Sequence, residues 1–292
     1  MASAKDLRKR ITSVKNTQQI TRAMKMVAAA KLRRAQENII SLRPYAREIN
    51  RMILALSKNA ADEVEHPLMK PRDQAKSVLL IVVTSDRGLC GAFNGNVIKT
   101  AQRFLRTEPG KYETADLAFI GKKGYEFFRS RKPGKYYQGF FFKLDFKKSQ
   151  SLAEELIDLY LSGKYDEIKV VYNEFKSVLS QRVSLENFLP VREEGAEASA
   201  ASGQGSPITI YEPNAKEILS QLLPKHFAIQ AHRYLLESLA SEHAARMTAM
   251  ENATKNAGEM IRKITLQYNK TRQAGITKEL LEIVSGAESL KG

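Results

Sequence analysis

The sequence predicts a small α/β domain and a long antiparallel coiled coil that the two ends of the chain form together. The coiled coil is predicted by a seven-residue apolar repeat over residues 4–58 and by a second apolar seam over residues 214–290. The α/β domain is predicted by strand-like and helix-like stretches that alternate over residues 76–190. Because the two helical segments flank this domain in the sequence, they can pair only in opposite directions.

Residues 4–58 are expected to form one long helix. Ser3 has the position of its N-cap, and Asp6 that of the acidic partner three residues on. Pro44 should kink this helix near residues 40–44. Twelve of the fifteen seam positions are apolar, and the three polar ones lie together, where the seam opens or meets a polar group. The positions are Leu7, Ile11, Val14, Gln18, Thr21, Lys25, Ala28, Leu32, Ala35, Ile39, Leu42, Ala46, Ile49, Ile53 and Leu56.

Residues 209–292 are expected to supply the second coiled-coil helix. Asn214 and Glu217 form another capping signal, and Pro224 predicts a short helix ahead of the long one. Small and flexible residues dominate the seam of the long helix, which suits the small residues Ala28 and Ala35 of its partner. The seam consists of Leu236, Ala240, His243, Met247, Met250, Thr254, Ala257, Ile261, Ile264 and Tyr268.

Residues 76–190 are expected to form a Rossmann-like α/β foot domain whose first strands are parallel. Val78–Val83 is an unbroken apolar run, typical of a buried central strand. Ser151 with Glu154 should cap the last helix, and Gly163 should end it. The other predicted strands are Asp116–Ile120, Tyr136–Phe142, Glu167–Asn173 and Val183–Phe188, and the predicted helices are 96–106, 123–130 and 152–162. Residues 191–208 should form a flexible loop, because Glu193–Ser206 is rich in Ala, Ser, Gly and Glu.

The composition points to an anionic partner and to a reducing compartment. The formal net charge is +15, and residues 1–58 alone contain fourteen Lys and Arg against three Asp and Glu. Such an excess implies an acidic protein surface, a nucleic acid or an anionic membrane. The single cysteine, Cys90, excludes an internal disulfide. No apolar run approaches the roughly 20 residues of a membrane helix, and Met1 opens directly on helical sequence, so neither insertion nor a targeting peptide is expected.

The positive charge gathers on one face of the first helix. A face that only solvates the helix would mix both signs, whereas like charges repel one another unless a partner supplies anions. A plain solvated face remains the simpler interpretation from composition alone. The basic face comprises Arg8, Lys9, Arg10, Arg22, Lys25, Lys31, Arg33, Arg34 and Arg47.

Motifs for catalysis, cofactors or metals are not evident. The stretch Gly88-Leu-Cys-Gly91 with Gly95 follows a strand, as a phosphate loop would, but its spacing fits neither Walker A nor Gly-x-Gly-x-x-Gly. We expect a tight turn whose glycines adopt positive φ, with Asp86 and Arg87 fixing the loop or meeting a neighbour. The four histidines lack metal-binding spacing.

The last segment of the chain, from residue 272, is an apolar helix with few charges. Its face would be costly to leave in water, at roughly 25 cal/mol per Å². Something outside the chain is therefore expected to surround it. The apolar residues are Ile276, Leu280, Leu281, Ile283, Val284 and Ala287, and a small polar group consists of Arg272, Gln273, Thr277 and Glu279.

Three motifs, in order along the chain, resemble the γ-subunit family of F-type ATP synthases. The first runs from Lys5 through Asn16 to Lys31, the second is Thr84–Asn94, and the third combines Ile276-Thr277, Glu279, Glu282 and Gly286-Ala287. The resemblance implies a non-catalytic central rotor stalk that couples proton flow through the membrane c-ring to ATP synthesis or hydrolysis on the α3β3 ring. It also implies binding to the ε subunit and a peripheral location on the cytoplasmic face of a bacterial inner membrane.

The same resemblance implies roles for the candidate residues. Arg272 and Gln273, with Thr277 and Glu279, would meet a catch loop of the β subunit, and the apolar tip would turn in a sleeve of catalytic subunits. The basic face would meet the acidic levers of the β subunits. Independently of the resemblance, the apolar seams place Leu32, Ile39, Met247 and Ile261 where they would hold the coiled coil together.

Two other functions stay open at this point. A nucleic-acid-binding coiled-coil protein would set the basic N-terminal helix against phosphates. The apolar C-terminal tip and the lack of a base-reading motif count against this function. Strong, salt-dependent binding of the purified chain to DNA would support it. An isolated nucleotide-binding domain is a weaker third possibility, which a ligand-induced shift in melting temperature would support.

Overall fold

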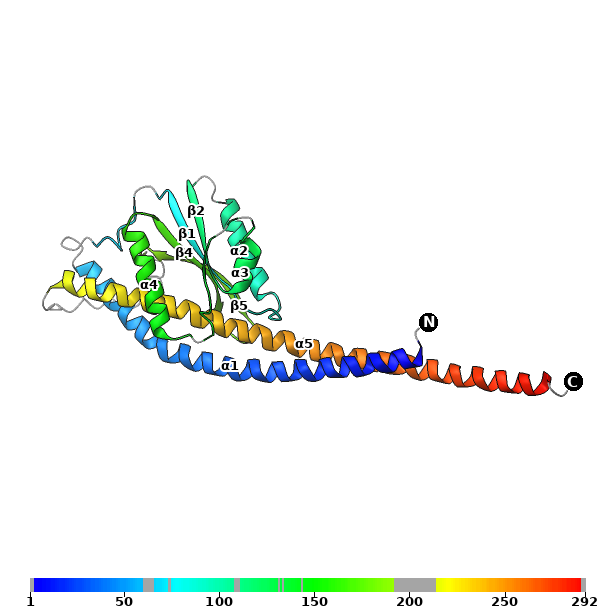
Figure 1. Cartoon of the computed structure of the whole chain (residues 1–292). Helices are drawn as coiled ribbons and strands as arrows, with labels where there is room; N and C mark the ends of the chain where they lie inside the picture. The colour runs from blue at the N-terminus through cyan, green and yellow to red at the C-terminus, as the bar shows by residue number, and fades with distance from the viewer. Residues whose placement is uncertain are drawn as a thin grey trace. The chain divides into compact units, whose positions relative to one another are not determined.

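The computed structural model describes residues 3–59, 66–72, 75–107, 111–130, 132, 134–142, 144–191 and 214–289. The chain divides into two compact units. Unit 1 consists of Met1–Ala29 and Arg246–Gly292, and unit 2 consists of Ala30–Ala245. The helices α1 and α5 (Figure 1) each contribute residues to both units. The predicted loop at residues 191–208 lies outside the described residues, apart from Val191.

The N-terminal helix is α1, Ala4–Asn59, and it begins with the predicted capping box. The backbone N–H of Asp6 donates to Ser3 Oγ at 3.2 Å, and Ser3 Oγ donates to Asp6 Oδ2 at 2.8 Å. None of the fifteen predicted seam positions is exposed, and ten are buried. The helix continues through Pro44, so the kink at this residue stays a prediction.

The C-terminal helix is α5, Ala215–Ser289. Its predicted cap is confirmed, since the N–H of Glu217 donates to Asn214 Oδ1 at 2.8 Å. The predicted break at Pro224 is wrong, because α5 runs through this residue. Leu223 and Phe227, which flank the proline, are no more than 1% exposed. We attribute the continuity to this packing, which outweighs the poor helix propensity of proline.

The sheet lies in unit 2 and has the strand order β3-β2-β1-β4-β5. Its strands are β1 Ser77–Val83, β2 Thr114–Ile120, β3 Lys135–Tyr137, β4 Glu167–Phe175 and β5 Gln181–Leu189. The first four strands are parallel, and β5 pairs antiparallel with β4. The expected α/β foot with a mostly parallel sheet is therefore observed.

Helices cover both faces of this sheet, as Figure 1 shows. The helices α2, Phe93–Thr107, and α3, Lys122–Phe128, lie on one face, where Val78, Leu80 and Val82 enter their core. The helix α4, Phe146–Leu161, packs on the opposite face with parts of α1 and α5, where Leu79 and Ile81 are buried. The alternating side chains of β1 thus attach both helix layers to one sheet.

Two predicted elements of the foot differ from the structure. The helix α4 starts six residues before the predicted start, because Asp145 is its N-cap and accepts a hydrogen bond from the N–H of Lys148 at 2.9 Å. Ser151 is therefore inside the helix and does not cap it. The predicted strand Tyr136–Phe142 is shortened to β3 by a turn in which Gly139 has φ of 71°.

Asp166 joins the start of β1 to the segment before it. Its carboxylate accepts hydrogen bonds from the backbone N–H groups of Lys76 and Ser77, each at 2.9 Å, and from Ser77 Oγ at 2.8 Å. Arg72 Nη1 donates a further bond at 2.7 Å. Burial would raise the pKa of Asp166, but the hydrogen bonds from Arg72, Ser77 and Lys76 outweigh it and lower the pKa to about 2.

Asp166→Asn is expected to lower the free energy of unfolding at neutral pH by about 2 kcal/mol, since each pKa unit corresponds to roughly 1.4 kcal/mol. A depressed carboxylate pKa stabilises the fold above its unfolded value of 3.8 and loses this effect as the pH falls toward about 2. The difference between variant and parent in urea unfolding should therefore shrink between pH 7 and about pH 2.5. Exposed Asp158, replaced in the same way, is the control; an equal Asp166→Asn deficit at both pH values would contradict the electrostatic explanation.

Candidate functional site

The last turns of α5 form an exposed helix in unit 1. Every described side chain from residue 272 to residue 286 is exposed, although α5 remains helical to Ser289. Figure 1 shows α5 continuing past the start of α1, so α1 does not cover this stretch. We call residues 272–289 the tip.

The apolar side chains of the tip lie mostly along one stripe. Ile276, Leu280, Ile283 and Val284 follow the 3-4 spacing of one helix face, and they are 48–67% exposed. Leu281, 61% exposed, lies off this stripe. The side chain of Ala287 lies outside the described ones. A stripe of this kind is unusual on a surface that stays in water.

The polar group of the tip faces outward as well. Thr277 Oγ1 donates to the carbonyl of Gln273 at 3.0 Å, within the helix. The side chains of Arg272, Gln273 and Glu279 have no hydrogen bond or ion pair to other described residues. Lys278 and Glu282, which lie away from the apolar stripe, form an exposed pair at 3.5 Å. The structure thus brings the predicted tip residues together and leaves them open to a partner.

The basic face is largely exposed in both units. Arg8, Lys9, Arg10 and Arg22 are exposed in unit 1, and Arg33 and Arg34 are exposed in unit 2. Arg33 pairs with Glu37 of the same helix at 3.2 Å, with both side chains mostly in solvent. Exposed pairs of this kind contribute about 0–1 kcal/mol, so the pair does not prevent Arg33 from meeting another anion.

Lys25 differs from the rest of the basic face. Its ammonium group lies 3.0 Å from Glu251 Oε1 on α5, and its side chain is 38% exposed. The hydrogen bond and the charge of Lys25 lower the pKa of Glu251. This residue therefore serves the coiled coil as well as the basic face.

The polar interruption of the seam contacts other polar residues of the same chain. Thr21 Oγ1 and Thr254 Oγ1 are 2.7 Å apart, and Gln18 Nε2 donates to the carbonyl of Thr254 at 3.4 Å. A Cβ atom at Gly258 would lie 3.1 Å from Gln18 Nε2, so glycine gives this amide room. From one contact to the next, the residue number increases along α1 while it decreases along α5. The two helices therefore run antiparallel in unit 1, as predicted.

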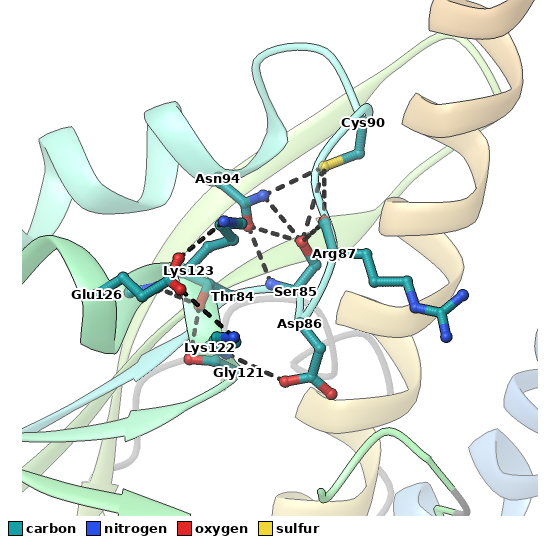
Figure 2. Close-up of polar contacts among 11 residues, drawn as sticks. Thr84, Ser85, Asp86, Arg87, Cys90, Asn94, Gly121, Lys122, Lys123 and Glu126 are labelled. Carbon is teal, nitrogen blue, oxygen red and sulfur yellow. Dashed lines mark hydrogen bonds and ion pairs between the residues drawn. The ribbon is translucent and has the colours of Figure 1, made fainter. Parts of the chain in front are cut away.

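The loop after β1 uses its polar groups internally (Figure 2). The N–H of Ser85 donates to Asn94 Oδ1 at 2.9 Å. At the start of α3, the N–H of Lys122 donates to Asp86 Oδ1 at 3.0 Å and that of Gly124 donates to Thr84 Oγ1 at 2.8 Å. Because these amides are already bonded, they are not available as phosphate ligands.

Close packing supports the same loop. Gly121 has φ of 99°, and a Cβ atom there would lie 1.9 Å from the carbonyl oxygen of Thr84. Of the three glycines predicted to adopt positive φ in this stretch, Gly91 does, with φ of 57°, whereas Gly88 and Gly95 do not. Leu89 has a positive φ of 64°. Cys90 is buried and accepts from Asn94 Nδ2 at 3.2 Å. The loop is thus a tight strand–helix turn.

No metal-binding group of three or more His, Cys, Asp or Glu occurs among the described residues. Burial, aided by the charge of Arg233, lowers the pKa of His226 to about 4. His232 Nδ1 lies 2.8 Å from Ser149 Oγ, and burial lowers its pKa although Asp145 opposes the shift. Both imidazoles are therefore neutral at pH 7. None of the described helices is long and apolar enough to cross a lipid bilayer.

A partly buried ionic group joins α5 to the sheet, and it was not predicted from the sequence. Arg233 Nη2 donates to Glu186 Oε2 at 2.8 Å, and Tyr172 OH donates to Glu186 Oε1 at 2.6 Å. Arg233 also lies 4.0 Å from Glu237, one turn along α5. The spacing of Arg233 and Glu237 could have indicated their contact, but no local pattern links either residue to a strand about fifty residues away.

Comparison with known proteins gives one consistent result. A family model described as ATP synthase matches residues 3–290. The chain is 52% identical to the ATP synthase gamma chain of Geotalea daltonii and 50% identical to that of Geobacter metallireducens, with complete coverage of both chains in each comparison.

Solved structures agree on the fold. A chain of the Euglena gracilis mitochondrial ATP synthase has a TM-score of 0.68 at 20% identity, over 98% of this chain and 94% of its own. A chain of the Tetrahymena thermophila central stalk and c-ring structure has a TM-score of 0.59 at 23% identity, over 80% and 99%.

Proposed function

Since the chain belongs to the ATP synthase gamma-chain family and forms the central rotor stalk of that complex, we propose that it acts through surfaces that bear on other subunits. The stalk couples proton flow through the c-ring to ATP synthesis or hydrolysis on the α3β3 ring. In this proposal the chain contributes no catalytic group. The observation that carries it is the tip, where apolar side chains of a well-formed helix stay exposed.

The tip fits a bearing inside a ring of other subunits. Burying a Leu, Ile or Val side chain completely stabilises an assembly by roughly 1.5–3 kcal/mol relative to leaving it in water. Ile276, Leu280, Ile283 and Val284 supply such side chains on one stripe. Non-directional contacts of this kind suit an axle that turns, because they favour no single angle strongly. Arg272, Gln273, Thr277 and Glu279 would add hydrogen bonds to a catch loop of one β subunit at a time.

The basic face fits the acidic levers of the β subunits. Arg8, Lys9, Arg10 and Arg22 are exposed and of one sign. Attraction between exposed charges is weak and screened by salt. Such an attraction allows the stalk to pass three equivalent partners in turn, whereas deeply buried ion pairs would hold it at one of them.

The remaining partners follow from the same function. The foot in unit 2 would rest on the c-ring and bind the ε subunit. The complex is membrane-associated, and we place this chain on the cytoplasmic face of a bacterial inner membrane as a peripheral subunit. The comparisons give no support to the nucleic-acid-binding alternative.

Co-purification tests the proposal directly. A tagged chain expressed with the α and β chains of its own complex should elute as a particle with three α, three β and one copy of this chain. The particle should hydrolyse ATP, while the isolated chain should not. Failure of the chain to associate with α and β under low-salt conditions would overturn the rotor function.

Replacing Arg8, Arg33 and Arg34 together by Ala is expected to weaken the coupling between ATP hydrolysis and proton pumping. Each single replacement should have little effect, since an exposed pair contributes only about 0–1 kcal/mol. Proton pumping per ATP hydrolysed in reconstituted vesicles is the measurement. Lys270→Ala, an exposed cation of α5, is the matched control. If coupling in the triple variant is unaltered at low salt, the basic face is only a solvated surface and does not bind a partner.

A further inference from the structure

A cavity of about 650 Å³ lies in unit 2, where α1, α5 and the β4–β5 hairpin meet. None of its lining residues belongs to the tip, to the loop after β1 or to unit 1. Its lining is mainly polar and charged, with aromatic side chains between. Its polar groups differ in whether they already have a partner.

Two of the three carboxylates of the cavity are paired. Glu186 accepts from Arg233 at 2.8 Å and from Tyr172 at 2.6 Å. Glu174 forms an ion pair with Lys176 at 2.5 Å and accepts a longer bond from Ser184 at 3.4 Å. These groups need no further ligand.

Glu237 is the third carboxylate, and it is incompletely paired. The residue is 4% exposed, and its Oε2 has no hydrogen-bond partner among the described residues. Its Oε1 lies 4.0 Å from Arg233 Nη1, which is too long for a hydrogen bond. Burial raises the pKa of Glu237, because the charged form is poorly solvated there, and the positive charges of Arg233 and Arg43 oppose this shift without cancelling it. A buried carboxylate without a donor is costly.

Asn187 lines the same cavity and offers a second unsatisfied acceptor. Its Nδ2 donates to the carbonyl of Pro190 at 2.6 Å, while its Oδ1 is buried and has no described partner. Both unsatisfied atoms are oxygens that accept hydrogen bonds. The missing group is therefore a donor.

Two arginines of α1 restrict the kind of molecule that can supply this hydrogen-bond donor. Arg43 and Arg47 line the cavity one helical turn apart, and both are exposed. Neither lies within ion-pair distance of another described residue, although the charge of Arg43 acts on Glu237. They would repel an isolated cation, so the occupant must carry an anionic group beside its donor. A polypeptide with neighbouring basic and acidic side chains meets both requirements.

We propose that a neighbouring subunit of the ATP synthase inserts a lysine side chain into this cavity, where its ammonium group donates to Glu237 Oε2. A carboxylate of the same segment meets Arg43 and Arg47. Lysine fits better than arginine, because a compact ammonium suits one open oxygen, whereas a guanidinium fork is matched to both oxygens of a carboxylate. The inference rests on the rotor function, since it requires neighbouring subunits.

Zero-length coupling tests the contact in the assembled complex. A water-soluble carbodiimide joins a lysine amine to a carboxylate only where the two touch. Mass spectrometry of the digested complex should find Glu237 joined to a lysine of another chain, and Glu237→Gln should abolish this product. Glu48→Gln, which removes an exposed carboxylate of α1, should leave it unchanged. Glu237 joined only to Lys176 of its own chain, or to no lysine, would overturn the inference.

Retention in the complex provides a second measurement. Glu237→Gln should weaken retention of the chain about tenfold, the effect of one lost charged hydrogen bond. The isolated chain should melt no lower than its parent, because Glu237 Oε2 has no donor there. A lower melting temperature with unchanged retention would make Glu237 purely structural. If the complex assembles but no coupling appears, only this contact fails; if nothing assembles, the rotor function fails.

Discussion

Replacing Ile39 by Asp is expected to abolish the assembled complex. Ile39 is 4% exposed on α1, so the variant loses apolar burial and places a carboxylate where it finds no donor. Loss of a buried Ile side chain alone costs about 2–5 kcal/mol, and an unpaired buried charge adds to that. A domain is stable by only about 5–15 kcal/mol. Gel filtration of the co-expressed complex and thermal melting of the isolated chain are the measurements.

The neighbouring residue supplies the control. Ile40 is 65% exposed on the same helix, so Ile40→Asp introduces the same charge one position away without burying it. We expect normal assembly and a change in unfolding free energy within roughly 0.5 kcal/mol. Equal damage from both variants would show that helix propensity or net charge, and not the seam, explains the result. Normal melting of Ile39→Asp would show that this position faces outward in solution.

The seam could be predicted from the sequence because its information is local. A repeat of seven residues places one side chain per two turns on the same face, whatever lies elsewhere in the chain. Leu32 and Ile39 are buried as expected, and Met247 and Ile261 are at least half covered. The polar interruption and Thr254 are both visible in the two seams, but their pairing is not, because the register between the helices depends on the folded domain between them.

The errors arose where packing decides between local signals. Asp145 and Ser151 both begin a plausible capping pattern, and the structure uses Asp145. Pro224 favours a break in α5, yet burial of Leu223 and Phe227 keeps the helix continuous. Long-range ionic contacts are also invisible to a local pattern. Lys25 was assigned to a partner subunit, and its pairing with Glu251 on α5 appears only once both helices are in place.

The candidate surfaces were predictable for a different reason. A charged or apolar face that the chain cannot satisfy itself is already evident from composition and helical period. The structure places the tip and most of the basic face in solvent. The roles assigned to individual tip residues stay predictions, because they concern atoms of other subunits.

Removing residues 276–292 is expected to slow ATP turnover of the reconstituted complex strongly while the chain still folds. The deletion takes away the apolar stripe, which makes no buried contact within unit 1, since its described side chains are all exposed. The seam up to Tyr268 and the foot remain. We therefore expect an unchanged melting temperature for the isolated chain and a less stable complex. Complete loss of turnover would instead indicate that the tip carries a catalytic group.

The polar group of the tip can be tested without deleting it. Arg272→Ala combined with Gln273→Ala should reduce steady-state ATPase about tenfold or more, because hydrogen bonds to a charged donor contribute about 1.5–3 kcal/mol. Lys278→Ala is the matched control, since this exposed cation pairs with Glu282 away from the apolar stripe. The isolated double variant should melt like its parent, because neither side chain has a partner among the described residues. Unchanged turnover would remove both residues from the catch-loop contact, whereas a clear drop in the melting temperature of the isolated chain would make their role structural.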